Sequence, residues 1–333
     1  MKITKAEILW SRKCKLNCSY CSMVDNRKNT PTLQNWFDGF KNLKSLGCSF
    51  AAFYGAEPLE EFEKLPDVIN FAELNNIHTT VITSGIVDDL DKKLKILYNH
   101  GLRSITTSYD YVSTDSSSTL KTSKALEVIN SFRSIGPVRD VAVVMTLTRA
   151  NFRYLPDVIK VMSKENIWTF FDIIHPSRNQ PGTKVKDTNK DLLFLKEDFP
   201  DLIQILNEVA IMKNSGDFLC HASKYFIGYL RSALISKIDY FKFWNCAHNS
   251  LLFPSWVTVD CDGTVKPCDD FFDPNQKIIK IWELYDNWYI FQDIWSKIVS
   301  SKCPGCLWNT HLDSHFIKEG SLPITDYIHG LEK

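Results

Sequence analysis

Cysteine is the residue type with the clearest chemical potential in this chain of 333 residues, which contains ten of them. Three lie within eight residues near the N-terminus and five lie between residues 246 and 306; the full set is Cys14, Cys18, Cys21, Cys48, Cys220, Cys246, Cys261, Cys268, Cys303 and Cys306. Disulfide frameworks belong to small secreted domains, whereas this chain is large and begins without an apolar export signal. Grouped thiols in a reducing compartment are most often metal ligands, so the sequence predicts metal binding.

The first group, Cys14, Cys18 and Cys21, has the spacing i, i+4, i+7 directly after a strand-like segment. A short loop with this spacing can hold three corners of a cubane iron–sulfur cluster and leave the fourth iron without a protein ligand. An open coordination position separates a catalytic metal site from a closed structural one. The alternative is a zinc loop, but a fourth ligand is missing nearby and no histidine is close in sequence.

Strand-like and helix-like segments alternate over the first half of the chain and must position this loop. Segments rich in apolar or β-branched residues predict strands over residues 8–10, 50–54, 79–83, 104–108, 141–147 and 169–174. Apolar residues at helical spacing predict helices over residues 33–46, 66–74, 90–98, 122–132 and 155–162. This order implies an α/β fold with a parallel sheet, either closed as a full or partial barrel or left open and doubly wound. In each case chemistry is expected in loops at the carboxyl ends of the strands.

The pattern changes after about residue 177. Residues 191–242 look mainly helical, strand-like segments follow at 256–259 and 264–266 around a turn at 261–263, and an aromatic-rich helix is predicted over 281–298. We therefore place a domain boundary near residue 235, which gives a first domain of residues 1–235 and a small second domain of residues 236–333.

Composition and charge argue against several classes of function. Lys+Arg 39 balance Asp+Glu 39 without any cationic tract, which argues against nucleic acid as the main partner. No stretch approaches about 18 consecutive apolar residues, so no membrane span is predicted. Without an export signal, the protein is expected to be cytoplasmic.

The cysteine spacing resembles the signature of the radical S-adenosylmethionine (radical SAM) enzymes, Cys-x3-Cys-x2-Cys with an aromatic residue, here Tyr20, before the last cysteine. Three segments at the ends of successive strands are similar to family motifs: Gly55-Ala56-Glu57-Pro58 to Gly-Gly-Glu-Pro, Thr83-Ser84-Gly85 to Thr-Asn-Gly, and Ser108-Tyr109-Asp110 to Ser-x-Asp. Ala56 departs from the second glycine but leaves Glu57 available to the methionine amino group. The resemblance covers about residues 5–215 and implies a partial (β/α)6 TIM-like barrel. The cofactor-binding residues that it implies are Tyr20, Gly55, Glu57, Pro58, Ser84 and Ser108.

The resemblance also implies a mechanism. Cys14, Cys18 and Cys21 would hold a 4Fe–4S cluster whose open iron binds the amino and carboxylate groups of SAM. One electron, from an external donor such as flavodoxin or ferredoxin, would cleave SAM to methionine and a 5′-deoxyadenosyl radical. That radical would abstract a hydrogen atom from an unactivated carbon, while the barrel interior excludes water and aims one C–H bond.

The second cysteine group resembles the SPASM/twitch extension that many radical SAM enzymes carry. Gly263-x4-Cys268 and Cys303-x2-Cys306, with Cys246 upstream, match the shorter twitch form, because no cysteine follows Cys306. A small C-terminal α+β twitch-like domain is therefore expected, with one auxiliary 4Fe–4S cluster on Cys246, Cys268, Cys303 and Cys306. The alternative is a tetrathiolate zinc site, which two separated cysteines and a Cys-x2-Cys pair could also build.

A fully ligated auxiliary cluster cannot bind substrate and is expected to accept or pass an electron, which favours oxidation of the substrate radical. The candidate catalytic residues are Asp110 as a general base, His175 at the mouth of the predicted barrel, and Cys261 as a hydrogen-atom donor. Ordinary structural roles are the alternative for each, and for Cys261 the turn itself provides one.

The substrate is expected to be a small metabolite, oxidised by dehydrogenation or radical coupling, because no peptide-recognition segment precedes the first strand. Two alternatives stay open. One is an epimerase or cross-linking maturase of a ribosomally made peptide. The other is a non-catalytic, zinc-stabilised binding module.

Overall fold

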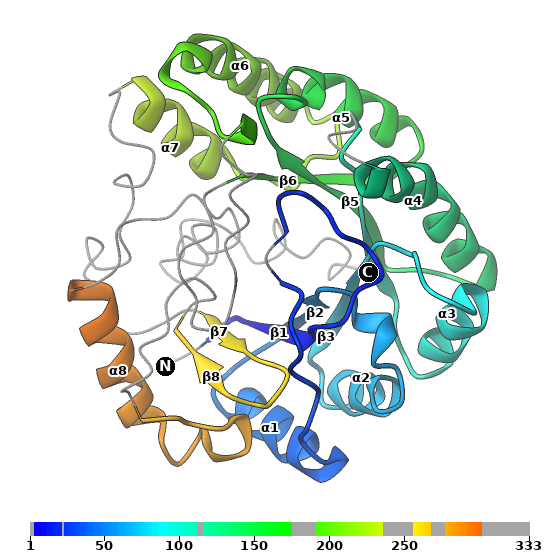
Figure 1. Cartoon of the computed structure of the whole chain (residues 1–333), viewed down its shortest axis with the longest axis vertical. Coiled ribbons are helices and arrows are strands. Elements are labelled where there is room, and N and C mark those ends of the chain that lie inside the picture. The colour runs from blue at the N-terminus through cyan, green and yellow to red at the C-terminus, as the bar shows by residue number, and fades with distance from the viewer. Residues whose placement is uncertain are drawn as a thin grey trace.

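The computed structural model of this chain describes residues 3–21, 23–111, 116–174, 191–235, 256–267 and 277–301. Within them, one sheet has the strand order β6-β5-β4-β3-β2-β1-β7-β8, with parallel pairing throughout except between β7 and β8. The sheet is curved, and helices α1 to α6 lie in an arc along its outer side (Figure 1). Because these helices cover one side only, the doubly wound alternative is excluded.

Six β/α repeats build the sheet and its outer layer. The strands are β1 (Lys5–Ser11), β2 (Phe50–Gly55), β3 (His78–Thr83), β4 (Ser104–Ser108), β5 (Asp140–Leu147) and β6 (Trp168–Ile173). The helices are α1 (Leu33–Ser45), α2 (Leu65–Leu74), α3 (Leu90–Asn99), α4 (Ser116–Ile135), α5 (Leu155–Lys164) and α6 (Phe199–Ser215). Among the described residues no strand pairing joins β6 to β8, so the barrel is open. The predicted partial (β/α)6 barrel is confirmed.

Strand β1 lies inside the sheet and shows how the sequence specifies its two faces. Ile8 and Trp10 are fully buried in the core between sheet and helices, where the ring centroid of Trp10 lies 4.9 Å from that of Trp36 on α1. The alternate residues Lys5 and Glu7 point to the opposite face. There Lys5 Nζ lies 2.7 Å from Glu7 Oε1 in a buried ion pair. The inner face of the curved sheet therefore carries polar groups.

The C-terminal segment continues the same sheet beyond β1. Strand β7 (Trp256–Val259) pairs in parallel with β1, and β8 (Val265–Lys266) returns antiparallel to β7 (Figure 1). Helix α7 (Lys224–Ile235) precedes this hairpin, and α8 (Trp288–Ser301) follows it. The boundary predicted near residue 235 coincides with the end of α7, but residues 236–255 lie outside the described part of the chain, and the boundary stays a prediction.

The helix predicted over 281–298 begins later than expected, at Trp288. Residues Ile281–Glu283 instead form a single 3₁₀ turn, η5, that packs on α1. The backbone carbonyl of Ile281 accepts a hydrogen bond from Asn42 Nδ2 at 3.0 Å, and the backbone N–H of Ile281 donates to the carbonyl of Gly263 at 2.8 Å. A Cβ on Gly39 would lie 2.7 Å from the Ile281 side chain, so the turn and α1 are in close contact. These contacts fix a turn where the apolar pattern alone predicted helix.

The last turn of α2 is joined to two strands through Glu73. Its carboxylate accepts a hydrogen bond from the N–H of Thr79 at 2.7 Å and lies 3.1 Å from Nη2 of Arg139. Burial opposes the charged carboxylate, but His78 and Arg139 outweigh it and lower the pKa of Glu73 to about 2.

Glu73→Gln is expected to lower the free energy of unfolding at pH 7 by about 3 kcal/mol, the equivalent of a pKa that falls from 4.5 to about 2 on folding. Because the folded pKa is the lower one, this stabilisation is present above pH 4.5 and is lost as the pH falls towards 2. Urea unfolding of both proteins at pH 7 and pH 3 measures the difference, which should at least halve at pH 3. A difference that stays constant would contradict the ion-pair account.

Candidate functional site

The cysteine loop, residues 14–21, leaves β1 at the carboxyl end of the strand. Cys18 is buried and Cys14 and Cys21 are half-buried, and none of the three forms a disulfide. The loop is locally ordered by its own backbone, since the N–H of Leu16 donates to Cys14 Sγ at 3.3 Å and the N–H of Cys21 donates to the carbonyl of Cys18 at 3.2 Å. The predicted ligands therefore share one short loop at the edge of the sheet where chemistry was expected.

Burial raises the pKa of the Cys14 thiol to about 11, partly opposed by the Leu16 amide, and Glu57, Cys21 and Cys18 contribute to the rise. The three sulfurs and the Glu57 carboxylate are therefore close enough to interact electrostatically. A thiol with this pKa is protonated at neutral pH, so iron binding must release its proton. No three His, Cys, Asp or Glu side chains of the described residues form a ready-made site for a single metal ion.

The end of β2 meets the end of β1 beside this loop. Gly55 has φ +141°, and a Cβ there would lie 2.3 Å from the carbonyl oxygen of Ser11, so only glycine fits. The N–H of Ala56 donates to that same carbonyl at 2.9 Å. The chain then enters a 3₁₀ turn, η1 (Pro58–Glu60), which begins with the buried Pro58. The Gly-Ala-Glu-Pro segment is thus a fixed turn, packed against the base of the cysteine loop.

The Glu57 side chain is held on the buried side of this turn, and its predicted contact with SAM stays a prediction. It is fully buried, and its carboxylate accepts hydrogen bonds from Thr83 Oγ1 at 2.7 Å, Ser84 Oγ at 2.6 Å, Ser84 N–H at 2.9 Å and Leu59 N–H at 3.2 Å. Burial raises the pKa of Glu57, and these hydrogen bonds offset part of the rise. The carboxylate joins the β2 turn to the end of β3, which leaves the backbone of the turn as the surface beside the cysteine loop.

A second polar cluster holds the other end of the cysteine loop. The hydroxyl of Tyr20 donates to Asp110 Oδ2 at 2.5 Å, and Lys121 Nζ on α4 donates to that hydroxyl and lies 2.7 Å from the same carboxylate oxygen. Asp110 and Lys121 are buried. Burial opposes the charge of Lys121, but Asp110, Cys18 and Cys21 outweigh it and raise its pKa. Asp110 thus orients Tyr20 and Lys121 beside the loop, and its predicted role as a general base stays a prediction.

Lys121→Met is expected to destabilise the protein by about 3 kcal/mol, because it leaves the Asp110 carboxylate buried without its cation. Lys124→Met on the same helix is the matched control, since Lys124 forms only an exposed pair with Glu127 and should change the free energy of unfolding by less than about 0.5 kcal/mol. Urea unfolding of the three proteins measures both effects. Equal stabilities for the two variants would contradict the importance of the buried pair.

The remaining predicted residues are placed as follows. Ser84 joins the Glu57 cluster, and Ser108 is half-buried at the end of β4. Cys261 is fully buried in the turn between β7 and β8, where burial and Asp260 raise its pKa to about 12. Its role as a hydrogen-atom donor stays a prediction. His175 and the four expected auxiliary ligands Cys246, Cys268, Cys303 and Cys306 lie outside the described residues.

Three residues of this region were not singled out from the sequence. In the sequence, Lys121 is one of several lysines in a polar helical segment. Arg12 and Asp260 are charged residues that belong to no recognisable motif. Arg12 is fully buried at the base of the cysteine loop and pairs with Asp260, whose Oδ2 lies 2.9 Å from Arg12 Nη2. The feature of the sequence that could have identified Arg12 is its position, because it comes two residues before Cys14, where a buried strand ends.

The donor set fits an iron–sulfur cluster better than a single ion. Three cysteines in one loop, none of them in a disulfide, beside a glycine turn that packs on the base of the loop, suit three corners of a cubane with one iron open to a ligand. A tetrahedral zinc site needs four protein ligands already gathered around one ion, and no group of even three His, Cys, Asp or Glu side chains is gathered in this way among the described residues.

A family model of the radical SAM superfamily matches residues 8–175, half of the chain. The chain therefore belongs to the radical SAM superfamily, a class of enzymes that use a 4Fe–4S cluster and SAM. The matched segment begins within β1 and contains the cysteine loop and strands β2 to β6.

Solved structures have the same fold over almost the whole chain. Streptococcus suis SuiB bound to S-adenosylmethionine matches with a TM-score of 0.66 and 16% identity, over 96% of this chain and 75% of SuiB. SuiB bound to its precursor peptide SuiA matches with a TM-score of 0.64 and 16% identity, over 96% of this chain and 74% of SuiB. Native anSMEcpe with bound AdoMet and Cp18Cys peptide matches with a TM-score of 0.60 and 18% identity, over 96% of both chains. At these identities the likeness shows the fold alone.

Proposed function

We propose that this protein cleaves SAM reductively and uses the resulting 5′-deoxyadenosyl radical to abstract a hydrogen atom from its substrate. The observation that carries the proposal is the set of three cysteines in one loop, none of them in a disulfide, held between the Gly55 turn and the Tyr20–Asp110–Lys121 cluster. When bound to these thiols, a 4Fe–4S cluster would supply the electron that splits SAM into methionine and the radical.

The residues of the chain would contribute position and shielding. Cys14, Cys18 and Cys21 would hold the cluster. The backbone of the turn at Gly55 would face the methionine group of SAM, because Glu57 holds the turn in place from its buried side. The half-buried Ser108, at the end of β4, would contact SAM from the neighbouring strand end. Such fixed groups lower the barrier by orientation and by excluding water.

For the outcome of the reaction we propose oxidation of a small metabolite, by dehydrogenation or radical coupling. This proposal rests on the sequence pattern of Cys246, Cys268, Cys303 and Cys306 as ligands of an auxiliary 4Fe–4S cluster that accepts an electron. A cytoplasmic location and a flavodoxin or ferredoxin as electron donor go with this proposal.

Modification of a peptide is the second candidate. It is favoured by the match to SuiB and anSMEcpe, which have been solved with a precursor peptide and with a Cp18Cys peptide, over 96% of this chain. No helix among the described residues is long and apolar enough to cross a bilayer.

The test is the amount of iron, labile sulfide and zinc per chain after anaerobic reconstitution, for wild type and for the Cys268→Ala variant. About eight irons in wild type, falling to about four in the variant, are expected for two 4Fe–4S clusters. About four irons in both proteins, together with zinc, would indicate that the C-terminal cysteines hold a structural zinc ion and not an auxiliary cluster. That result would favour redox-neutral chemistry. Zinc without iron would contradict the enzyme and favour the binding module.

A further inference from the structure

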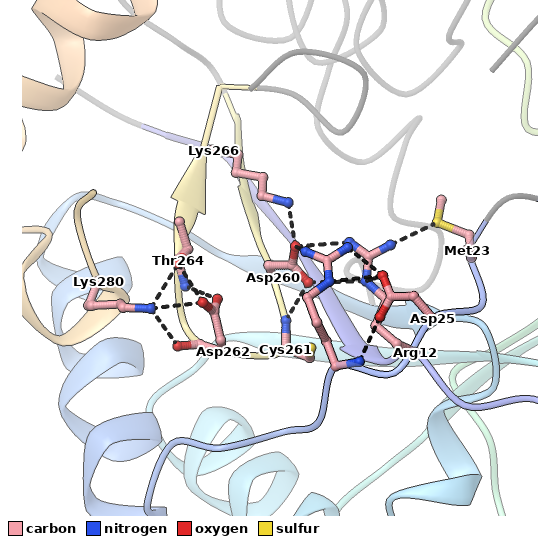
Figure 2. A network of polar contacts seen from close by, with 10 residues as sticks. Arg12, Met23, Asp25, Asp260, Cys261, Asp262, Thr264, Lys266 and Lys280 are labelled. Atoms are coloured by element: carbon pink, nitrogen blue, oxygen red, sulfur yellow. Dashed lines mark hydrogen bonds and ion pairs between the residues drawn. The ribbon is translucent and has the colours of Figure 1, made fainter. Parts of the chain in front are cut away.

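A buried charge network lies where the base of the cysteine loop meets the β7–β8 hairpin (Figure 2). We call it the Asp260 network; its members are Arg12, Asp25, Arg27, Asp260 and Lys266. Arg12 contacts both oxygens of Asp260, with Nε 3.2 Å from Oδ1 and Nη2 2.9 Å from Oδ2. Arg27 Nη1 lies 2.8 Å from Oδ2, and Lys266 Nζ donates to the same oxygen. Three cationic side chains therefore contact the single carboxylate of Asp260.

Both stems of the cysteine loop take part in this network. Arg12 lies two residues before Cys14, and its backbone carbonyl accepts a hydrogen bond from the N–H of Asp25 at 3.2 Å. Asp25 in turn lies 2.6 Å from Nη2 of Arg27. The entering stem and the leaving stem are thus joined to one another and, through Arg12 and Arg27, to a carboxylate that is 248 residues away in sequence from Arg12.

Burial gives these contacts their strength. Arg12 is fully buried and Asp260 is 1% exposed. Burial opposes the charge of Asp260, but Lys266 and Arg12 outweigh it and hold its pKa well below the usual range. The network contains three cations and two carboxylates, so without Asp260 three cations would face Asp25 alone. A buried charge that loses its partner is strongly unfavourable, and the loop stems are expected to move to relieve it.

We propose that Asp260 is a positioning residue for the cysteine loop and that it acts through Arg12 and Arg27. The β7–β8 hairpin would then set the geometry of the first cysteine group as well as continuing the sheet. This inference rests on the proposed function only in taking the loop as the cluster site; the placement of the loop by Asp260 can be tested without any cluster.

The experiment measures the rate at which each thiol of the full-length, metal-free protein is alkylated by iodoacetamide, followed by peptide mass spectrometry. The variants are Asp260→Asn and Asp260→Asn/Lys266→Met; the second keeps the net charge of the wild-type network and lowers the risk of unfolding. The matched control is Asp262→Asn in the same turn, because Asp262 binds Thr264 and Lys280 outside the network. Cys48 and Cys220, buried in the core, report global unfolding within the same molecule.

Both Asp260 variants are expected to raise the alkylation rates of Cys14, Cys18 and Cys21 by about tenfold or more, while Cys48 and Cys220 stay at wild-type rates. The control Asp262→Asn should leave all five rates unchanged. Loop thiols that react no faster than in the control would overturn the proposal. An equal increase at Cys48 and Cys220 in both variants would also overturn it, because Asp260 would then serve general stability. Failure to bind iron in the wild-type protein would reject the proposed function without changing these rates.

Discussion

Replacement of Cys14 by Ala is expected to abolish the formation of 5′-deoxyadenosine from SAM. The cysteine loop offers three thiols within eight residues, so a cubane cluster that they hold would have two open irons instead of one when one thiol is removed. The variant should therefore lose the geometry that holds SAM, and with it the electron transfer to the sulfonium. Chromatography of the reaction products after anaerobic reduction measures 5′-deoxyadenosine directly.

Cys48→Ala is the matched control for this prediction. The Cys48 thiol is also buried and free, but it donates to the carbonyl of Phe50 at 3.2 Å in the core under β2, away from the loop. Burial raises its pKa to about 12, which is typical of an inert structural thiol. The control should keep iron content and 5′-deoxyadenosine formation. If Cys14→Ala retained the product, the cysteine loop would not be the site of SAM cleavage.

The sequence was sufficient for the order of the elements because each strand of the first half is a short segment rich in apolar or β-branched residues that alternates with a helical pattern. The run 50–54, for example, stops at Gly55, and the structure ends β2 there. The carboxyl ends of parallel strands lie at the same edge of a sheet. The sequence alone therefore predicted that the loop at Cys14 and the turn at Glu57 lie at one edge. Helix starts were less predictable: residues 281–283 have a helical apolar pattern, but contacts with α1 and Gly263 hold them in a 3₁₀ turn.

The direction of individual polar side chains was not predictable in the same way. The sequence motif gave no indication that the Glu57 carboxylate accepts hydrogen bonds from Thr83 and Ser84, because those donors come from the neighbouring strand end. Lys121 and Asp260 belong to no motif, and each matters because tertiary packing buries it beside a distant partner, Tyr20 for Lys121 and Arg12 for Asp260, which lie 101 and 248 residues away in sequence. Pairings of this kind depend on which strand ends become neighbours, and no pattern along one chain carries that information.

The buried position of Glu57 leads to the second large effect. Glu57→Ala removes an acceptor that four donors share, and each buried donor left without a partner costs about 1–3 kcal/mol. The turn from Gly55 to Pro58 would then lose its connection to β3 and shift relative to the cysteine loop. A displacement of about 1 Å near reacting groups can reduce a rate by about 10²-fold.

Glu57→Ala is therefore expected to reduce the rate of 5′-deoxyadenosine formation by about 10²-fold while the iron content of the cysteine loop remains that of wild type. Glu57→Gln should have an intermediate effect, because an amide keeps the size of the side chain but offers one acceptor oxygen instead of two. Glu63→Gln, an exposed position just after the turn, is the control and should keep the wild-type rate. Rates and iron content measured on the same preparations distinguish a misplaced SAM from a lost cluster as the cause of a lower rate. A Glu57→Ala protein that lost iron and activity together would assign Glu57 to cluster assembly, whereas an unchanged rate would show that the turn does not orient SAM.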